Sequence, residues 1–206
     1  LQTKNCFGCP SPNSTSDIYT GSNWKPGPAL PGKWGIWKEY PEGSCVVNLN
    51  TTHTFLIGGG YPISGEAWLY DWSSQGWTRT GSLIQGRKVH WCVSLGGQGI
   101  LVAGGFFEGL MVYTVELYDP AQGTWSSQPD LPRNIDSSAP ILLNWDGQVL
   151  VLFQGEDQIY KRSRENGEWS VLDGVRLPID FEEYFEESIG KAVLVPGNWS
   201  CNPEEE

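Results

Sequence analysis

The sequence has few charged residues, and most of the charges it has are negative. Charged residues make up 18% of the chain, and 24 Asp and Glu outnumber 13 Lys and Arg, which gives a formal net charge of −11. A surface that binds nucleic acid or an anionic membrane needs an excess of Lys and Arg, so this balance argues against both partners. No run of 18 apolar residues occurs either, and the sequence therefore predicts no membrane-spanning helix.

Apolar residues at helical spacing are nearly absent as well. The one candidate is the acidic stretch 180–187, which we interpret as a helical turn or a solvated loop. Elsewhere the apolar residues stand in short runs bounded by Gly, Pro, Asn or Asp, and the chain holds 26 Gly and 14 Pro. Short runs with such boundaries are typical of β-strands, so the sequence predicts an all-β protein.

The short strands recur with a period of roughly 50 residues, which indicates a repeat architecture. Each repeat holds an apolar run that ends in glycine, then a strand that carries a Tyr, then a lone Trp. The glycines are Gly58, Gly59, Gly104 and Gly105; the tyrosines are Tyr70, Tyr118 and Tyr160; the tryptophans are Trp24, Trp77, Trp125 and Trp169. Because one such unit cannot bury both of its faces, we expect the repeats to stack around an axis.

This combination of markers resembles the kelch repeat, and the resemblance extends from about Asp17 to Pro196. It implies four-stranded antiparallel blades in which the glycine doublet ends the second strand, the Tyr lies on the third and the Trp on the fourth. More narrowly, the chain is similar to the secreted, cysteine-bearing kelch proteins of invertebrates. We expect the repeated Tyr and Trp side chains to fill the space between blades.

The markers predict a β-propeller of about four blades. The three complete blades fall at 43–83, 88–129 and 138–173. A composite fourth blade would join two N-terminal strands, at 17–20 and 23–27, to a C-terminal strand at 191–195. The alternative is a half-propeller that a second chain completes. The predicted division is an N-terminal Cys-containing segment (1–16), the propeller (17–196) and a C-terminal Cys-containing acidic tail (197–206).

Sequons and cysteines indicate the secretory pathway. Three N-x-Ser/Thr sequons lie in predicted loops, at Asn13, Asn50 and Asn198. Five cysteines are present, and a bridge from Cys6 or Cys9 to Cys201 would tie the termini together, although the sequence leaves the pairing open. Cys45 and Cys92 occupy matching repeat positions. We expect a secreted, extracellular, disulfide-bonded glycoprotein whose signal peptide has been removed.

Histidine is too scarce for most sites that use imidazole. His53 and His90 come from different blades, which argues against a copper site like that of galactose oxidase, a propeller enzyme. His90 and Cys92 would face the same side of a strand, as a base and a nucleophile would. The matching Cys45 has no such His, so we interpret both cysteines as part of the repeat. We predict no catalytic residue, no metal and no cofactor.

The excess of aromatic residues leaves one ligand hypothesis. Several lie outside the repeated Trp position and are candidates for stacking on a ligand: Trp34, Trp37, Trp68, Trp72, Trp91, Phe106, Phe107 and Trp145. The leading prediction of function is a secreted, non-catalytic module that binds a protein partner or a copy of itself. The alternatives are a carrier of an apolar pigment or lipid and, after it, a metal- or carboxylate-dependent hydrolase.

Overall fold

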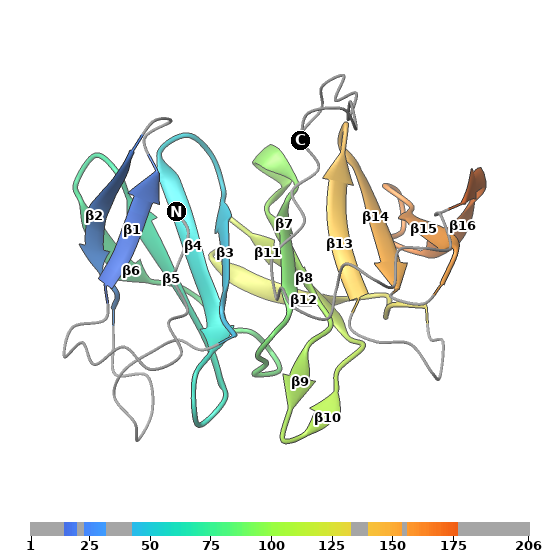
Figure 1. Ribbon diagram of the computed structural model, residues 1–206, viewed down its shortest axis with the longest axis horizontal. Helices are drawn as coiled ribbons and strands as arrows, with labels where there is room; N and C mark the ends of the chain where they lie inside the picture. The colour runs from blue at the N-terminus through green and yellow to red at the C-terminus, as the bar shows by residue number, and fades with distance from the viewer. Residues whose placement is uncertain (1–14, 20–22, 32–42, 133–139, 154–155, 177–206) are drawn as a thin grey trace, which may run out of the picture.

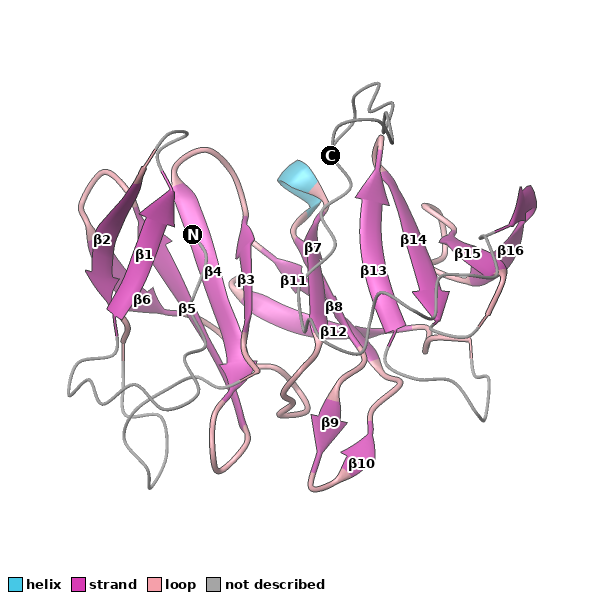
Figure 2. Cartoon of the chain, viewed as in Figure 1, coloured by secondary structure: helices cyan, strands magenta, loops and turns pink. Residues whose placement is uncertain are grey.

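The computed structural model describes residues 15–19, 23–31, 43–132, 140–153 and 156–176. Its strands form three antiparallel sheets of four strands each and two sheets of two strands (Figure 1). Figure 2 shows the same arrangement by secondary structure: the described residues form strands and a short 3-10 helix, η1, at Gly96–Gln98. No helix within these ranges has the length and apolar character needed to cross a membrane.

Each four-stranded sheet forms one blade. Blade one contains β3 (Cys45–Asn48), β4 (His53–Gly59), β5 (Ser64–Asp71) and β6 (Gly76–Arg79). Blade two contains β7 (Trp91–Ser94), β8 (Ile100–Ala103), β11 (Val115–Asp119) and β12 (Thr124–Gln128). Blade three contains β13 (Pro140–Trp145), β14 (Gln148–Phe153), β15 (Gln158–Arg162) and β16 (Trp169–Arg176). The predicted four-stranded antiparallel blades are confirmed at the three ranges expected for complete blades.

The blades pack face to face because their central strands are apolar on both sides. In β8, Ile100 and Val102 join a core cluster with the second strand of blade one, β4. Leu101 and Ala103, on the opposite side of the same strand, join a cluster with β14 of blade three. Alternate residues of a strand point to opposite faces, so one continuous apolar run supplies two cores.

A hydrogen bond from the fourth-strand tryptophan recurs at each blade boundary. The indole Nε1 donates to the carbonyl oxygen at the exit of the preceding fourth strand: Trp77 to Ala29 at 2.8 Å, Trp125 to Gly81 at 2.7 Å and Trp169 to Pro129 at 3.3 Å. The first of these acceptors, Ala29, is the last residue of the N-terminal hairpin, which consists of β1 (Thr15–Tyr19) and β2 (Trp24–Ala29). This hairpin therefore stands where the third and fourth strands of a preceding blade would stand, as predicted. The predicted C-terminal strand at 191–195 lies outside the described residues.

The first glycine of each doublet lies where the next blade begins. Gly58 and Gly104 have φ angles of +60° and +70°, which favour glycine. A Cβ on Gly58 would lie 2.7 Å from the carbonyl oxygen of Arg87, and one on Gly104 would lie 2.6 Å from the ring of Pro140. Both the backbone angle and the close approach of the next blade therefore require glycine at these positions.

Blade three departs from the aromatic pattern of the other two. In blade two, Tyr118 lies opposite Trp125, with ring centroids 5.1 Å apart. In blade three, Trp169 lies opposite Arg162, two positions further along the strand from Tyr160. The wider spacing of Tyr160 and Trp169 along the chain accounts for this shift, because the intervening turn keeps the register.

Candidate functional site

The hairpin β9–β10 contains Leu110, the most exposed large hydrophobic side chain among the described residues. It is inserted between the second and third strands of blade two and consists of β9 (Phe106–Phe107) and β10 (Leu110–Met111). Glu108 and Gly109 join the two strands with φ angles of +50° and +82°. Positive φ at both turn residues is the geometry that closes a two-residue hairpin. The sequence marked Phe106 and Phe107 as candidates for stacking on a ligand, and the structure places both in a paired hairpin.

Three segments at the end of the blades where this hairpin projects each carry an exposed apolar side chain. Leu110 of the hairpin is 73% exposed, Ile84 of the β6–β7 connection is 63% exposed, and Tyr61 of the β4–β5 loop is 55% exposed. Figure 1 shows the β4–β5 loop and the hairpin extending on the same side of the blades. We call the surface formed by the β4–β5 loop, the β6–β7 connection and the β9–β10 hairpin the loop face.

A hollow of about 230 Å³ lies beside the hairpin on the loop face. The hairpin and the residues after it supply its apolar wall, and the β6–β7 connection and the exit of blade two supply polar groups. The lining residues are Gln85, Phe107, Leu110, Met111, Val112, Tyr113, Thr114 and Asp130. Cavities that enclose a drug-sized ligand measure about 300–1,000 Å³, so this hollow is better suited to one side chain of a partner.

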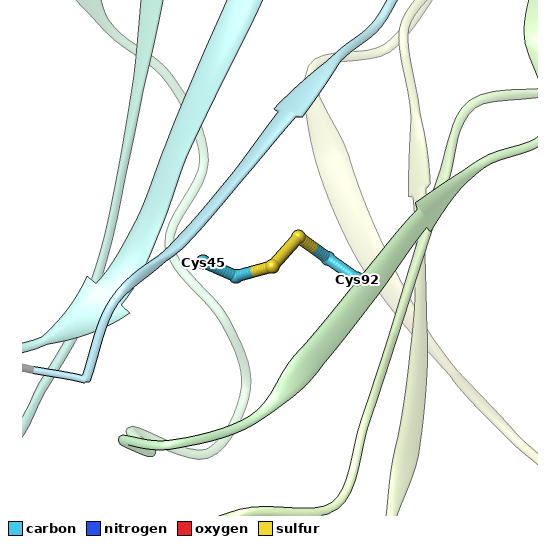
Figure 3. The surroundings of a disulfide bond; sticks show 2 residues. All are labelled: Cys45 and Cys92. Atoms are coloured by element: carbon cyan, nitrogen blue, oxygen red, sulfur yellow. A yellow bond between two sulfur atoms is a disulfide. The ribbon is translucent and has the colours of Figure 1, made fainter. Parts of the chain in front are cut away.

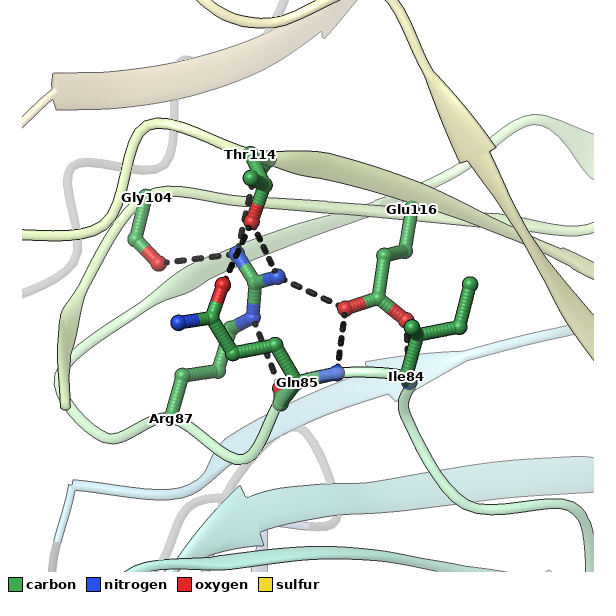
Figure 4. Close-up of polar contacts among 6 residues, drawn as sticks. All are labelled: Ile84, Gln85, Arg87, Gly104, Thr114 and Glu116. Atoms are coloured by element: carbon green, nitrogen blue, oxygen red, sulfur yellow. Dashed lines mark hydrogen bonds and ion pairs between the residues drawn. The ribbon is translucent and has the colours of Figure 1, made fainter.

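A buried ion pair bonds to the backbone of two segments of the loop face (Figure 4). Nη2 of Arg87 lies 2.7 Å from Oε1 of Glu116, and the two side chains are 0% and 2% exposed. Nη1 of Arg87 donates to the carbonyl oxygens of Gly104 at 3.1 Å and Thr114 at 2.7 Å. These two carbonyls flank the inserted hairpin, so a single guanidinium fixes both of its ends.

Glu116 in turn holds the neighbouring β6–β7 connection. Its Oε2 accepts a hydrogen bond from the backbone N–H of Ile84 at 2.7 Å, and its Oε1 accepts one from that of Gln85 at 3.2 Å. Burial lowers the pKa of Arg87 from its ordinary value, and the carboxylate of Glu116 opposes that shift. The ion pair therefore positions two of the three segments of the loop face together.

Sequence reasoning missed Arg87 and Glu116. The available signal was Glu116 itself, a charged residue between the apolar residues Val115 and Leu117 of the third strand. A carboxylate in such a strand requires a partner, because burial of an unpaired charge is costly. The partner is not visible from the sequence, since Arg87 lies on a connection and the other blades show no matching pair among the described residues.

Within the described residues, the predicted ligand-stacking side chains lie in several different parts of the blades. Trp68 and Trp72 are half-buried in and after β5, where their indole Nε1 atoms donate to Glu66 at 3.4 Å and Thr54 at 2.9 Å. Trp91 packs against the core clusters beside blade three. Trp145 is 48% exposed at the end of β13, away from the loop face.

Among the described candidates, Phe106 and Phe107 belong to the loop face. Phe106 and Phe107 are half-buried in β9, and Phe107 lines the hollow. Trp34 and Trp37 lie outside the described residues. The role of all these aromatics in ligand binding stays a prediction.

A disulfide joins the first strands of blades one and two (Figure 3). Cys45 of β3 and Cys92 of β7 are bonded, with their Cα atoms 6.1 Å apart. The sequence placed these cysteines at matching repeat positions without pairing them, while the predicted partners Cys6, Cys9 and Cys201 lie outside the described residues. Because its sulfur is bonded to Cys45, Cys92 offers no thiol to act as a nucleophile beside His90.

Side chains that could bind a metal ion together are not found within the described residues. No group of three or more His, Cys, Asp and Glu side chains there is arranged to hold a metal ion. His90 is 3% exposed just before β7, whereas His53 begins β4 at the far end of blade one. The two histidines belong to different blades, as expected from the sequence.

Comparison with known proteins gives the class of this chain. The kelch motif family matches residues 92–132. The chain is 32% identical over 127 residues to Kelch-like protein 35 of Mus musculus, and 31% identical over 144 residues to the F-box/kelch-repeat protein SKIP30 of Arabidopsis thaliana. These alignments cover 60% and 63% of this chain, but only 20% and 38% of the two relatives.

A solved structure supports the fold. The structure of YjhT superposes with a TM-score of 0.61 at 12% sequence identity, and the match covers 80% of this chain and 60% of that one. The stacked four-stranded blades, with their recurring tryptophan bond and glycine doublets, define a β-propeller fold. Within that class, the chain contains a kelch motif at residues 92–132 and is similar to kelch-repeat proteins.

Proposed function

We propose that this chain is a non-catalytic module that binds a protein partner through its loop face. The observation that carries the proposal is the set of exposed apolar side chains, Leu110, Ile84 and Tyr61, on three neighbouring segments. Exposed apolar groups on a monomer mark interaction surfaces when they are grouped. The similarity to kelch-like proteins, whose repeats are interaction scaffolds, supports the same class of function.

Two segments of the loop face are also held in a fixed conformation, which favours binding. The buried pair of Arg87 and Glu116 holds the hairpin ends and the β6–β7 connection, so little order has to be gained on binding. The hollow beside the hairpin can accept one apolar side chain, with Asp130 and Gln85 available for polar contacts at its edge. A partner with an exposed apolar side chain flanked by donor groups fits this surface.

The proposal is tested by cross-linking followed by a binding measurement. A photo-reactive residue at position 110 should capture a discrete partner that the same residue at position 145 does not capture. Leu110→Asp should then weaken the affinity of the purified partner by at least tenfold, about 1.4 kcal/mol. Trp145→Asp is the matched control, because Trp145 is exposed but lies away from the loop face. Equal losses in both variants would overturn the assignment.

The two alternatives predict different observations. A pigment or lipid carrier would show a visible absorption band or a ligand that co-purifies with native protein. A hydrolase would turn over glycoside, ester or peptide substrates, with loss on metal removal if a metal takes part. An appreciable turnover by the purified chain would contradict the non-catalytic proposal.

A further inference from the structure

The turn between β3 and β4 is built around the side chain of Asn50. Oδ1 of Asn50 accepts hydrogen bonds from the backbone N–H of Thr52 at 2.8 Å and from the hydroxyl of Thr52 at 2.9 Å. It also accepts one from the backbone N–H of His53 at 2.8 Å. The carbonyl half of the amide therefore carries the hydrogen bonds that shape the turn.

The other half of the same amide is available. Nδ2 of Asn50 makes no hydrogen bond with any described residue, and Asn50, Thr51 and Thr52 are all exposed. These three residues are the sequon Asn-Thr-Thr. A substituent on Nδ2 would extend into solvent and leave every hydrogen bond of the turn in place.

We propose that Asn50 carries an N-linked glycan, and that the chain accordingly folds in the secretory pathway. In the transfer step, Nδ2 forms a bond to the anomeric carbon of a pyrophosphate-activated oligosaccharide. The bond between that carbon and the pyrophosphate oxygen breaks, the pyrophosphate leaves with the bonding electrons, and Nδ2 loses one proton. No oxidant or reductant is needed, and the hydroxyl of Thr52 is the group that the sequon supplies beside the amide.

The disulfide gives independent support for the same compartment. Cys45 begins β3, the strand that leads to Asn50, and it is bonded to Cys92. Disulfides form and persist in oxidising compartments, which are also those where N-linked glycans are added. Two unrelated modifications of one hairpin therefore require the same location.

The site is compatible with an interaction at the loop face. The β3–β4 turn lies at one end of β4, and the β4–β5 loop of the loop face lies at its other end. A glycan on Asn50 therefore leaves the loop face open. Failure of the proposed interaction would leave this site untouched, and the reverse holds as well.

Tryptic peptide mapping tests the site directly. The full chain is expressed with a secretion signal in eukaryotic cells, and both medium and cell lysate are analysed. The three sequons fall on different tryptic peptides, and the peptide 39–79 contains only the one at Asn50. We expect this peptide to carry a glycan and, after enzymatic removal of the glycan in heavy-oxygen water, to show Asp with heavy oxygen at position 50. Without reduction it should remain linked to peptide 89–133 through the disulfide.

Three variants distinguish a loss of glycosylation at Asn50 from a loss of folding. Thr52→Ala should abolish occupancy at Asn50 completely, whereas Thr52→Ser should retain it because the hydroxyl is kept. Asn50→Asp keeps the acceptor oxygen of the turn but lacks the amide nitrogen, so it should fold and remain unmodified. An unmodified 39–79 peptide in the wild-type chain overturns the proposal, whether or not the disulfide forms. Occupancy that survives Thr52→Ala would overturn it too.

Discussion

The boundary between blades one and two and the boundary between blades two and three share one bond but differ in what surrounds it. At both, a fourth-strand indole donates to the carbonyl at the exit of the preceding blade, through Trp125 and Trp169. The first boundary adds the disulfide Cys45–Cys92 and a hydrogen bond of 2.6 Å between the hydroxyls of Thr80 and Tyr118. The connection across it also contains the buried Arg87.

The second boundary depends on packing and on polar bonds nearer the surface. Its core cluster joins the apolar sides of blades two and three. Nη2 of Arg162 donates to Oε1 of Gln128 at 2.6 Å, and Nδ2 of Asn144 donates to the carbonyl of Ser94, also at 2.6 Å. The described residues contain no disulfide and no ion pair at this boundary.

The difference shows where the chain needs a fixed geometry rather than more stability. A buried ion pair adds little net stability over a well-packed apolar pair, because desolvation of the two charges offsets their attraction. What Arg87 and Glu116 do supply is directional bonding to the hairpin ends and to the β6–β7 connection. The additional interactions of the first boundary therefore lie next to the loop face. The second boundary depends on the apolar packing that all the repeats share.

The largest expected effect comes from removing one partner of the ion pair. Glu116→Ala leaves the Arg87 guanidinium charged and without its partner at a site that is 0% exposed, so the free energy of unfolding should fall by about 3–5 kcal/mol. Chemical denaturation measures it. The matched control is Glu66→Ala, which removes the exposed pair of Arg79 and Glu66 and should cost less than about 1 kcal/mol. Similar losses in both variants would contradict the comparison.

The double variant Arg87→Met with Glu116→Leu separates stability from geometry. Replacing both charges with apolar groups should recover most of the stability that Glu116→Ala loses. It should not recover the binding of a partner at the loop face, since the bonds to Gly104, Thr114 and Ile84 are gone. Full recovery of binding would show that the ion pair has no positioning role.

The disulfide should give the second largest effect. Cys45→Ser with Cys92→Ser removes a bridge between residues 47 positions apart, and the free energy of unfolding should fall by about 2–4 kcal/mol. Reduction of the wild-type chain should lower its Tm to that of the variant. A reductant that leaves the wild-type Tm unchanged would mean that the bridge does not tie the first boundary.

The strands of both boundaries were predictable because each is a local signal. An apolar run between turn residues identifies a strand without any knowledge of its neighbours, and the repeat then gives the blade. The displaced pairing of blade three was also readable, since Tyr160 and Trp169 stand further apart in the chain than Tyr118 and Trp125. The hairpin turn at Glu108-Gly109 was not predicted, because Glu-Gly is not one of the dipeptides typical of a two-residue hairpin.

The disulfide and the ion pair at the first boundary were not predictable in the same way. Cys45 and Cys92 meet because two first strands lie side by side, which is a property of stacking and not of either segment. Arg87 and Glu116 meet because a connection folds back over the third strand. Contacts of this kind depend on how the blades stack, so one sequence without that arrangement leaves their partners open.

The recurring indole bond allows the two boundaries to be compared on equal terms. Trp125 is 9% exposed and bonds to Gly81 at 2.7 Å, whereas Trp169 is half-buried and its bond to Pro129 measures 3.3 Å. Trp125→Phe should therefore cost about 2 kcal/mol and Trp169→Phe about 1 kcal/mol, since each leaves a carbonyl without its donor. Denaturation of the two variants measures this, and a larger loss at Trp169 would reverse the order of the boundaries.

The smallest effect should come from Asp71, whose side-chain bonds stay within one outer turn of blade one. Its carboxylate accepts hydrogen bonds from the hydroxyl and backbone N–H of Ser73 and from the hydroxyl of Ser74, and these lower the pKa of Asp71 from 3.8 to about 2. The folded state thus binds the proton less tightly than the unfolded state. The resulting stabilisation is complete above about pH 4 and is lost as the pH falls through about 2. Asp71→Asn keeps an acceptor oxygen but cannot ionise. The Tm of the wild type should therefore exceed the Tm of the variant at pH 5, and the two values should converge toward pH 2. A difference in Tm that stays constant across this range would show that the charge on Asp71 does not stabilise the turn, and electrostatic stabilisation would then be confined to the boundaries between blades.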